Sequence, residues 1–368
     1  MNLSRRTFIA GAAFALAGAG GALLRSGGRR SGTLLSAFED ARGDQYVGGL
    51  SLDQERIFGA RVPMRAHGCA VDPLDPQRVL FFARRPGTHA FELRRDSMQV
   101  QKAFTTGEGR HLAGHGVFSR DGGLLFTPEH DYENIRGVIA VRDARTFRVV
   151  NEIDACGLDP HEIAWLPDGR TLLVANGGIL THPETFRRKL NIPTMDPSLC
   201  LIDSASGERL DQQRLADHLL SIRHLALAED GTAVVGLQYE GERAKSPGVV
   251  AMYRPGAKLR LLTAPRSDLQ KFNGYVSSLA ISEAHDVIAA ACPYGAGVAC
   301  WALSNERYLG FIEAGEVYGL SRLTDGSLAA SRRDGAALEF EQRRLRSHFL
   351  KFDSSAPIRW DDHWVAVA

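Results

Sequence analysis

The sequence has little cysteine and lacks the cysteine motifs of small stabilised folds. Its 368 residues include five cysteines, an odd number that is too low for a disulfide scaffold. Neither C-x-x-C nor C-x-x-C-H occurs, which excludes zinc-ribbon, thioredoxin-like and covalent c-type haem sites. Cys292 and Cys300 flank a predicted hairpin tip at residues 293–297. They form either a disulfide across that tip or two buried free thiols.

Several signatures of common enzymes are also absent. The chain contains no nucleophile elbow, no P-loop and no dinucleotide-binding fingerprint, so acyl hydrolysis, nucleotide triphosphate use and Rossmann redox chemistry lack support. An excess of one charge is missing too, because 44 Lys and Arg face 43 Asp and Glu. Nucleic-acid-binding proteins normally carry a basic excess. We therefore expect no nucleic-acid partner.

Long apolar runs are absent except for one near the start of the chain. Residues 8–24 are uncharged and rich in Ala and Gly, but they are fewer than the ~20 residues that span a membrane. The preceding block Ser4-Arg5-Arg6-Thr7-Phe8-Ile9 has the twin-arginine export pattern. We predict that residues 1–30 are a twin-arginine signal peptide and that the protein is periplasmic. Membrane contact is expected only through this segment, if it stays uncleaved.

Glycine is abundant, with 38 residues, and the chain repeats one phrase. Each copy has two apolar runs, and an Asp-Gly or Asp-Pro turn separates them in every copy except the one that begins at residue 278. The copies begin at residues 67, 115, 161, 224, 278 and 319, about 40–60 residues apart, a period typical of WD40/YVTN-like propeller blades. A strand near residues 47–50 is expected to complete one more blade with the C-terminus.

The repeats predict an all-β fold. We expect residues 31–368 to form a monomeric seven-bladed β-propeller, with four-stranded antiparallel blades around a central channel. A long inter-strand loop is expected at residues 176–199, where the β-pattern is weak. Its basic residues Arg187, Arg188 and Lys189 form either a flap over the channel mouth or a solvated charge run. The balanced overall charge suggests a neutral channel.

Several segments carry a family resemblance. They include Asp159-Pro160-His161-Glu162, Thr181-His182-Pro183 and Trp360-Asp361-Asp362-His363. These segments resemble the exported seven-bladed propeller family of unknown function that is often encoded beside imelysin-type periplasmic iron-uptake proteins. The resemblance implies the propeller fold, a periplasmic location, and a role in iron acquisition with an imelysin-type partner. It supplies no catalytic residues.

Four copies of the repeat begin with histidine. In a propeller, the first residues of each innermost strand lie at one mouth of the channel, so we expect these histidines to converge. Neutral imidazoles suit a copper or iron ion. The candidate metal ligands are His67, His115, His161 and His224. Further candidates, as ligands or as groups that orient ligands, are Glu129, His130, Glu162, His182 and His363, with Arg223 as an anion contact.

Purely structural roles remain an alternative for these residues. His115 and His224 precede their turn aspartate by six residues, whereas His161 does so by seven and His67 by five. A slip of one residue turns a strand side chain to the opposite face, so the histidines could point into separate blades. Arg223 could likewise form an ordinary salt bridge within its blade.

Three hypotheses about function follow, and the sequence does not decide whether the protein is an enzyme. The first is a metal-binding or metal-handling accessory protein in iron acquisition. The second is a histidine-ligated copper or iron oxidoreductase. The third is a protein-interaction scaffold without metal.

Overall fold

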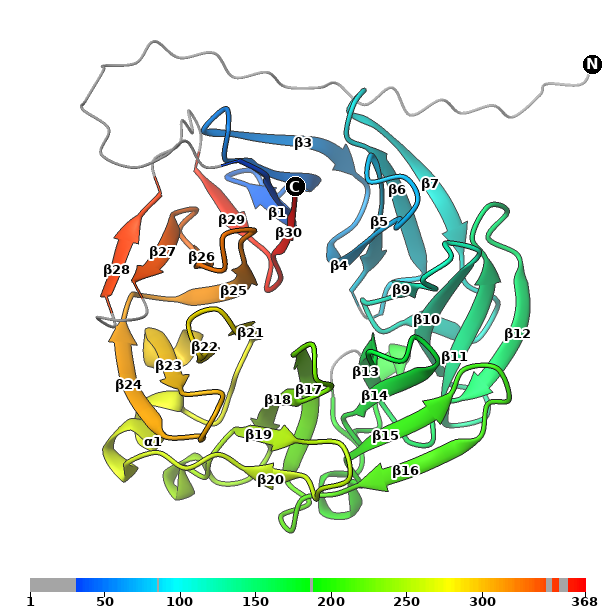
Figure 1. The fold of residues 1–368 in the computed structure, drawn as a ribbon. Coiled ribbons are helices and arrows are strands. Elements are labelled where there is room, and N and C mark those ends of the chain that lie inside the picture. Colours follow the sequence, from blue (N-terminus) through cyan, green and yellow to red (C-terminus); the bar gives the residue numbers. More distant parts are fainter. Residues whose placement is uncertain (1–30, 85, 186–187, 342–345, 351–356) are drawn as a thin grey trace, which may run out of the picture.

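The strands of the protein form seven antiparallel sheets arranged as a ring around a central opening (Figure 1). This computed structural model describes residues 31–84, 86–185, 188–341, 346–350 and 357–368. The predicted seven-bladed β-propeller is confirmed. The predicted signal peptide at residues 1–30 lies outside the described residues. In the described ranges, no helix has the length and apolar character needed to cross a membrane.

The first blade is built from both ends of the ring. Three of its strands come from the N-terminal part, namely β1 (Thr33–Asp40), β2 (Gln45–Ser51) and β3 (Arg56–Val62). Two short strands from the other end, β29 (Ile358–Trp360) and β30 (Val365–Val367), both pair antiparallel with β1. Figure 1 shows these red strands beside the blue ones. The expected closure of this blade by the C-terminus is confirmed.

The other six blades follow in chain order, and each begins nearest the axis and ends at the rim (Figure 1). The second contains β4 (Ala66–Val71), β5 (Arg78–Ala83), β6 (His89–Arg94) and β7 (Gln99–Thr105). The third contains β8 (Arg110–Leu112), β9 (Val117–Phe118), β10 (Leu124–Asp131), β11 (Arg136–Asp143) and β12 (Val149–Asp154). The fourth contains β13 (Pro160–Trp165), β14 (Thr171–Asn176), β15 (Ser198–Asp203) and β16 (Arg209–Gln213).

The remaining elements complete the ring. The fifth blade contains β17 (Leu220–Leu227), β18 (Ala233–Tyr239), β19 (Val250–Tyr253) and β20 (Arg260–Leu261). The sixth contains β21 (Ser278–Ser282), β22 (Val287–Cys292), β23 (Gly297–Trp301) and β24 (Tyr308–Glu313). The seventh contains β25 (Val317–Arg322), β26 (Leu328–Arg332), β27 (Ala337–Glu341) and β28 (Arg346–Phe349). The helices are α1 (Arg266–Phe272), η1 (Pro183–Thr185), η2 (Ile192–Thr194), η3 (Arg243–Lys245) and η4 (Pro293–Gly295).

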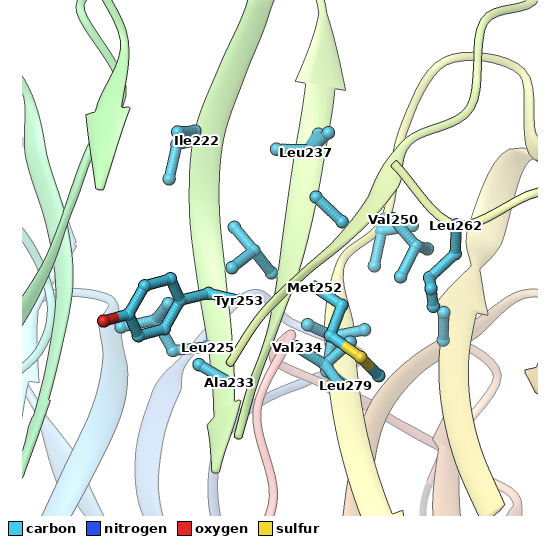
Figure 2. Packing of buried hydrophobic residues seen from close by; sticks show 14 of the residues in the cluster. Ile222, Leu225, Ala233, Val234, Leu237, Val250, Met252, Tyr253, Leu262 and Leu279 are labelled. Carbon is cyan, nitrogen blue, oxygen red and sulfur yellow. The ribbon is translucent and has the colours of Figure 1, made fainter. Parts of the chain in front are cut away.

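The core lies between neighbouring blades. Every residue of β14 and of β22 is buried, because each middle strand is covered on both faces. Figure 2 shows such packing in the fifth blade, where Leu237 and Met252 are buried in one cluster with Leu279 of the sixth blade. A buried aliphatic side chain of this size contributes about 1.5–3 kcal/mol. A single blade cannot bury both of its faces, so the closed ring is the stable unit.

The innermost strands are irregular at the positions that face the axis. The register of β4 with β5 shifts between Ala66 and Cys69, and that of β13 with β14 shifts between Pro160 and Glu162. In the third blade the innermost strand is divided into β8 and β9, and in the first blade into β29 and β30. Bulges and breaks change the direction of side chains. The number of residues between a histidine and its turn aspartate therefore does not determine whether that histidine faces the axis.

The two cysteines near the hairpin tip are not paired. In the β22–β23 register, Cys292 lies opposite Gly297, whereas Cys300 lies opposite Ala289. Both cysteines are buried free thiols. The structure therefore has two free thiols and no disulfide across the hairpin tip.

Trp360 tests how much stability the closure of the ring provides. Its side chain is 4% exposed, donates a hydrogen bond from Nε1 to the Gly335 carbonyl at 3.0 Å and packs on Phe38 with ring centroids 5.4 Å apart. We expect Trp360→Ala to lower the free energy of unfolding by about 3–5 kcal/mol, measured by urea denaturation. Val150→Ala, at an exposed rim position, should change it by less than about 0.5 kcal/mol. Equal effects of the two variants would contradict this role.

Candidate functional site

Five imidazoles meet at the axis of the propeller. They come from the second, third, fourth, fifth and first blades, and their neighbouring ring centroids lie 4.5 to 6.4 Å apart. The structure thus brings the four predicted histidines at the repeat starts together with the fifth candidate from the C-terminal segment. This histidine cluster consists of His67, His115, His161, His224 and His363.

Local backbone features aim these rings at the axis. His67 and His161 lie within the register shifts of β4 and β13. His115 lies in the break between β8 and β9, and His363 in the break between β29 and β30. In the fifth blade, the shift falls on the residue just before His224. The bulges and breaks therefore compensate for the unequal spacings that the sequence shows.

Two glycines allow the rings of His67 and His115 to pack against backbone. Gly114 has a φ of +105°, and a Cβ there would lie 2.8 Å from Cδ2 of His67. A Cβ on Gly68 would lie 2.8 Å from Nδ1 of His115. A side chain at either position would displace an imidazole of the cluster, so both positions require glycine.

The ring nitrogens form two groups with the spacing of a metal site. One group is His67, His115 and His161, and the other is His115, His224 and His363; within each, the nitrogens lie within 4.8 Å of one another. His115 belongs to both groups. A cavity of about 140 Å³ borders His67 and His161, and a second cavity of about 140 Å³ borders the other three histidines. Small molecules can therefore reach the cluster at two places.

The hydrogen bonds of His67 resemble those of a metal ligand. Its Nδ1 lies 2.6 Å from Oδ1 of Asp361, and carboxylates often orient metal-bound histidines in this way. Its Nε2 lies 3.2 Å from Nε2 of His363. His67 and His363 belong to different groups of possible ligands, so this contact joins the two groups.

His115 carries a buried nitrogen without a hydrogen bond. Its Nε2 has no hydrogen-bond partner among the described residues, and His115 is only 7% exposed to solvent. An unsatisfied buried polar atom costs roughly 1–3 kcal/mol. A metal ion bound at this nitrogen would remove that cost.

Burial keeps the cluster in the neutral form. It lowers the pKa of His115 and of His224 to about 3, and the pKa of His363 to about 4. The pKa values of His67 and His161 are well below the usual range, first because of burial and then because of a nearby guanidinium group. Neutral imidazole is the form that binds metals, so all five rings are ready to act as ligands at pH 7.

Two of the further candidates border the cluster. Oε2 of Glu162 lies 3.4 Å from Nδ1 of His224 and accepts a hydrogen bond from the Leu225 amide at 3.1 Å. His130 lines the cavity beside His67, and its Nε2 lies 3.8 Å from Oδ1 of Asp159. Both residues can orient or supplement the imidazoles.

Two other candidates are not brought to the cluster. Glu129 lies on β10, one strand away from the axis, and accepts hydrogen bonds from Thr127 and Arg142 inside the third blade. His182 has a side chain that is 43% exposed and contacts the ring of Tyr132. Neither belongs to a possible metal-binding group among the residues that the structure describes.

Arg223 lies beside the cluster rather than in a salt bridge within its own blade. Its NH1 is 3.3 Å from Oδ2 of Asp159 and 3.4 Å from Nδ1 of His161, and both partners belong to the preceding part of the ring. In the predicted basic loop, Lys189 lines the same cavity as Arg223. Arg187 lies outside the described residues.

Sequence reasoning missed four charged residues beside the cluster, namely Arg65, Arg84, Asp361 and Asp362, which form oppositely charged pairs. NH1 of Arg84 lies 2.8 Å from Nδ1 of His67 and 2.9 Å from Oδ2 of Asp362. Asp361 accepts a hydrogen bond from Nε of Arg65 at 2.6 Å. Burial opposes ionisation of Asp361, but Arg65 and Arg84 hold its pKa below the usual value. The adjacency of Asp361 and Asp362 to a candidate histidine was the available signal.

Comparisons with known proteins identify a family and a fold. The sequence model described as "Protein of unknown function (DUF1513)" matches residues 60–367. No curated protein matches the chain. Among solved structures, a chain of "Crystal Structure of Mitotic Checkpoint Complex" is similar with a TM-score of 0.54 and 12% identity, covering 77% of each chain. In all, 1288 chains match, and at 12% identity this likeness concerns the fold alone.

The buried histidines make the stability of the metal-free protein depend on pH. In the unfolded chain, histidine takes up a proton near pH 6.5, whereas the folded cluster stays neutral down to about pH 4. The unfolded state therefore binds more protons below pH 6.5, and stability falls as the pH falls. Each histidine should add about 1.4 kcal/mol per pH unit to that slope, measured by urea denaturation from pH 7 to 5.

The variant His224→Ala provides the control for this prediction. Without one buried imidazole, the slope should be shallower by about 1.4 kcal/mol per pH unit. Substitution of the exposed His218 by Ala should leave the slope unchanged. The same slope in all three proteins would show that the cluster is not the source of the pH dependence.

Proposed function

The chain belongs to the DUF1513 family of proteins of unknown function, and for this member we propose that the histidine cluster is a transition-metal centre. The observation that carries the proposal is the convergence of five imidazoles, from five blades, on the axis of the ring. His67, His115 and His224 are buried, and His161 and His363 are partly buried. Their low pKa values keep them available as ligands. The protein would bind a metal ion for handling or transfer.

The contacts of the histidines favour this proposal over a structural role. A histidine that only satisfies its own blade would bond within that blade. Here His67 of the second blade contacts Asp361 of the first, and His161 of the fourth contacts Arg223 of the fifth. These histidines thus form their polar contacts across blades, at the shared axis, and not within their own blades.

The donor set points to copper or iron. Imidazole nitrogens suit copper, iron and zinc, whereas calcium and magnesium prefer oxygen ligands. The two groups that share His115 would hold two ions if its ring bridged them as an imidazolate, which requires the ring to release its N–H proton to solvent when the second ion binds. We propose copper or iron as the occupant, because copper forms the most stable complexes with nitrogen ligands and the family resemblance suggests iron.

The proposed setting is the bacterial periplasm. The twin-arginine pattern at residues 4–9 supports export of the folded protein, and the resemblance supports a role in iron acquisition beside an imelysin-type partner. In that setting, the propeller would act as a metal-binding accessory protein.

A second candidate function is a histidine-ligated oxidoreductase. The cavity that borders His67 and His161 would allow a small substrate to reach a metal in the cluster. Redox cycling of the bound metal with turnover of a substrate would distinguish this function from metal handling.

Metal stoichiometry tests the proposal. Metal-free protein loaded with Cu(I) or Fe(II) and then desalted should retain two ions per chain, measured by elemental analysis. His161→Ala should lose the ion of the first group, and His363→Ala the ion of the second. His115→Ala should lose both, because its ring belongs to the two groups.

The exposed His218 offers a matched control. His218→Ala should retain the wild-type metal content, since its side chain lies outside the cluster. Absence of stoichiometric metal in the wild-type chain after loading with either metal would overturn the proposal. If the wild-type chain retains one ion and every cluster variant loses it, the cluster forms one shared site and not two.

A further inference from the structure

We propose that the cavity beside His67 and His161 binds a small anion through carboxylate or phosphate oxygens. This cavity of about 140 Å³ is called the arginine cavity below, and Arg84, Arg223, Lys189, Gln238 and Asp159 are among its lining residues. The anion would lie against one side of the histidine cluster.

The strongest evidence is the state of Arg223. This residue is 5% exposed, and its Nε has no hydrogen-bond partner among the described residues. Its NH1 already lies 3.3 Å from Oδ2 of Asp159. A guanidinium group presents its N–H donors in a planar fork that matches two oxygens of a carboxylate or phosphate. The unused donor of a buried arginine is therefore suited to an anionic oxygen.

Three cationic groups line the arginine cavity, namely Arg84, Lys189 and Arg223. Each is paired with a carboxylate: Asp362 contacts Arg84, Glu240 contacts Lys189, and Asp159 contacts Arg223. The charges therefore balance, and the suitability of the cavity for an anion rests on the unused guanidinium donor of Arg223.

The size of the cavity restricts the ligand to a few heavy atoms. Its volume is about 140 Å³. Pockets for drug-sized ligands measure about 300–1,000 Å³. Phosphate and oxalate have suitable dimensions. The amide of Gln238 adds a neutral hydrogen-bonding group to the lining.

The second cavity at the cluster lacks these features. It is lined by His115, His224, His363 and Glu162, together with mostly small and apolar residues, and no arginine or lysine of the described chain borders it. An anion is thus expected on one side of the cluster alone.

The anion would also complement a bound metal. Asp361 and Asp362 are already paired with arginines. They would therefore not balance the positive charge of a metal ion bound to neutral imidazoles. This role as a counter-ion or metal ligand rests on the proposed function. The site itself is formed by protein groups and does not require the metal.

Titration calorimetry on the metal-free, full-length protein at pH 7 tests the inference. Phosphate and oxalate are compared with chloride at equal ionic strength, and we expect one saturable site for at least one of the two oxyanions. Tighter binding of phosphate would indicate a free inorganic ligand, and tighter binding of oxalate the carboxylates of a small metal chelator. Either result supports the anion site.

Two variants locate the binding in the arginine cavity. Arg223→Gln should weaken the affinity at least tenfold, because it removes the guanidinium donors. Gln238→Glu should weaken it to a similar extent by charge repulsion while Arg223 stays in place, so the test does not depend on the folding of one variant. Arg145→Gln, at an exposed position outside the cavity, should bind as the wild type does.

Two results would overturn the inference. The first is that neither phosphate nor oxalate binds the wild type more tightly than chloride. The second is that Arg223→Gln and Gln238→Glu, both folded by circular dichroism, keep wild-type affinity. The metal content of the wild-type chain is measured separately, so an anion site without metal would contradict the proposed function alone.

Discussion

The antiparallel pairing of β1 with β29 and β30 is the interaction on which the rest of the structure depends. Residues near Phe38 pair with Trp360 and its neighbours, and the start of β1 pairs with β30. This pairing joins the two ends of the ring, and only a closed ring covers both faces of every blade. The segment between β29 and β30 carries Asp361, Asp362 and His363. The closure therefore completes the hydrophobic core and the axial cluster in one step.

The polar contacts at the axis join different blades. His67 contacts Asp361, Arg84 contacts Asp362, and Arg223 contacts Asp159. Buried ion pairs add little net stability, because removing two charges from water offsets much of their attraction. They do fix the blades relative to one another, since a shifted blade would leave a buried charge unpaired. These contacts therefore define the relative positions of the axial side chains more than they add stability.

The repeats in the sequence predicted the fold, because each blade repeats a short pattern of apolar strands and turns. The same repeats identified His67 and His224 as residues near the channel. They could not show which way the side chains point, since the bulges and breaks of the innermost strands have no sequence signature. Glu129 was misplaced because its strand lies one position away from the axis. Arg84 was missed because it follows the second strand of its blade, far from any repeat start.

The position of His363 in the chain has a consequence for the order of biosynthesis. This residue follows its neighbour His67 in the cluster by 296 residues, and the strands on either side of it close the ring. Protein chains leave the ribosome from the N-terminus, and early segments begin to fold first. The other four imidazoles are thus synthesised well before the fifth, and a nascent or truncated chain has neither the closed ring nor the complete set of five rings. Convergence of all five imidazoles therefore has to follow synthesis of the segment that carries His363 and β30.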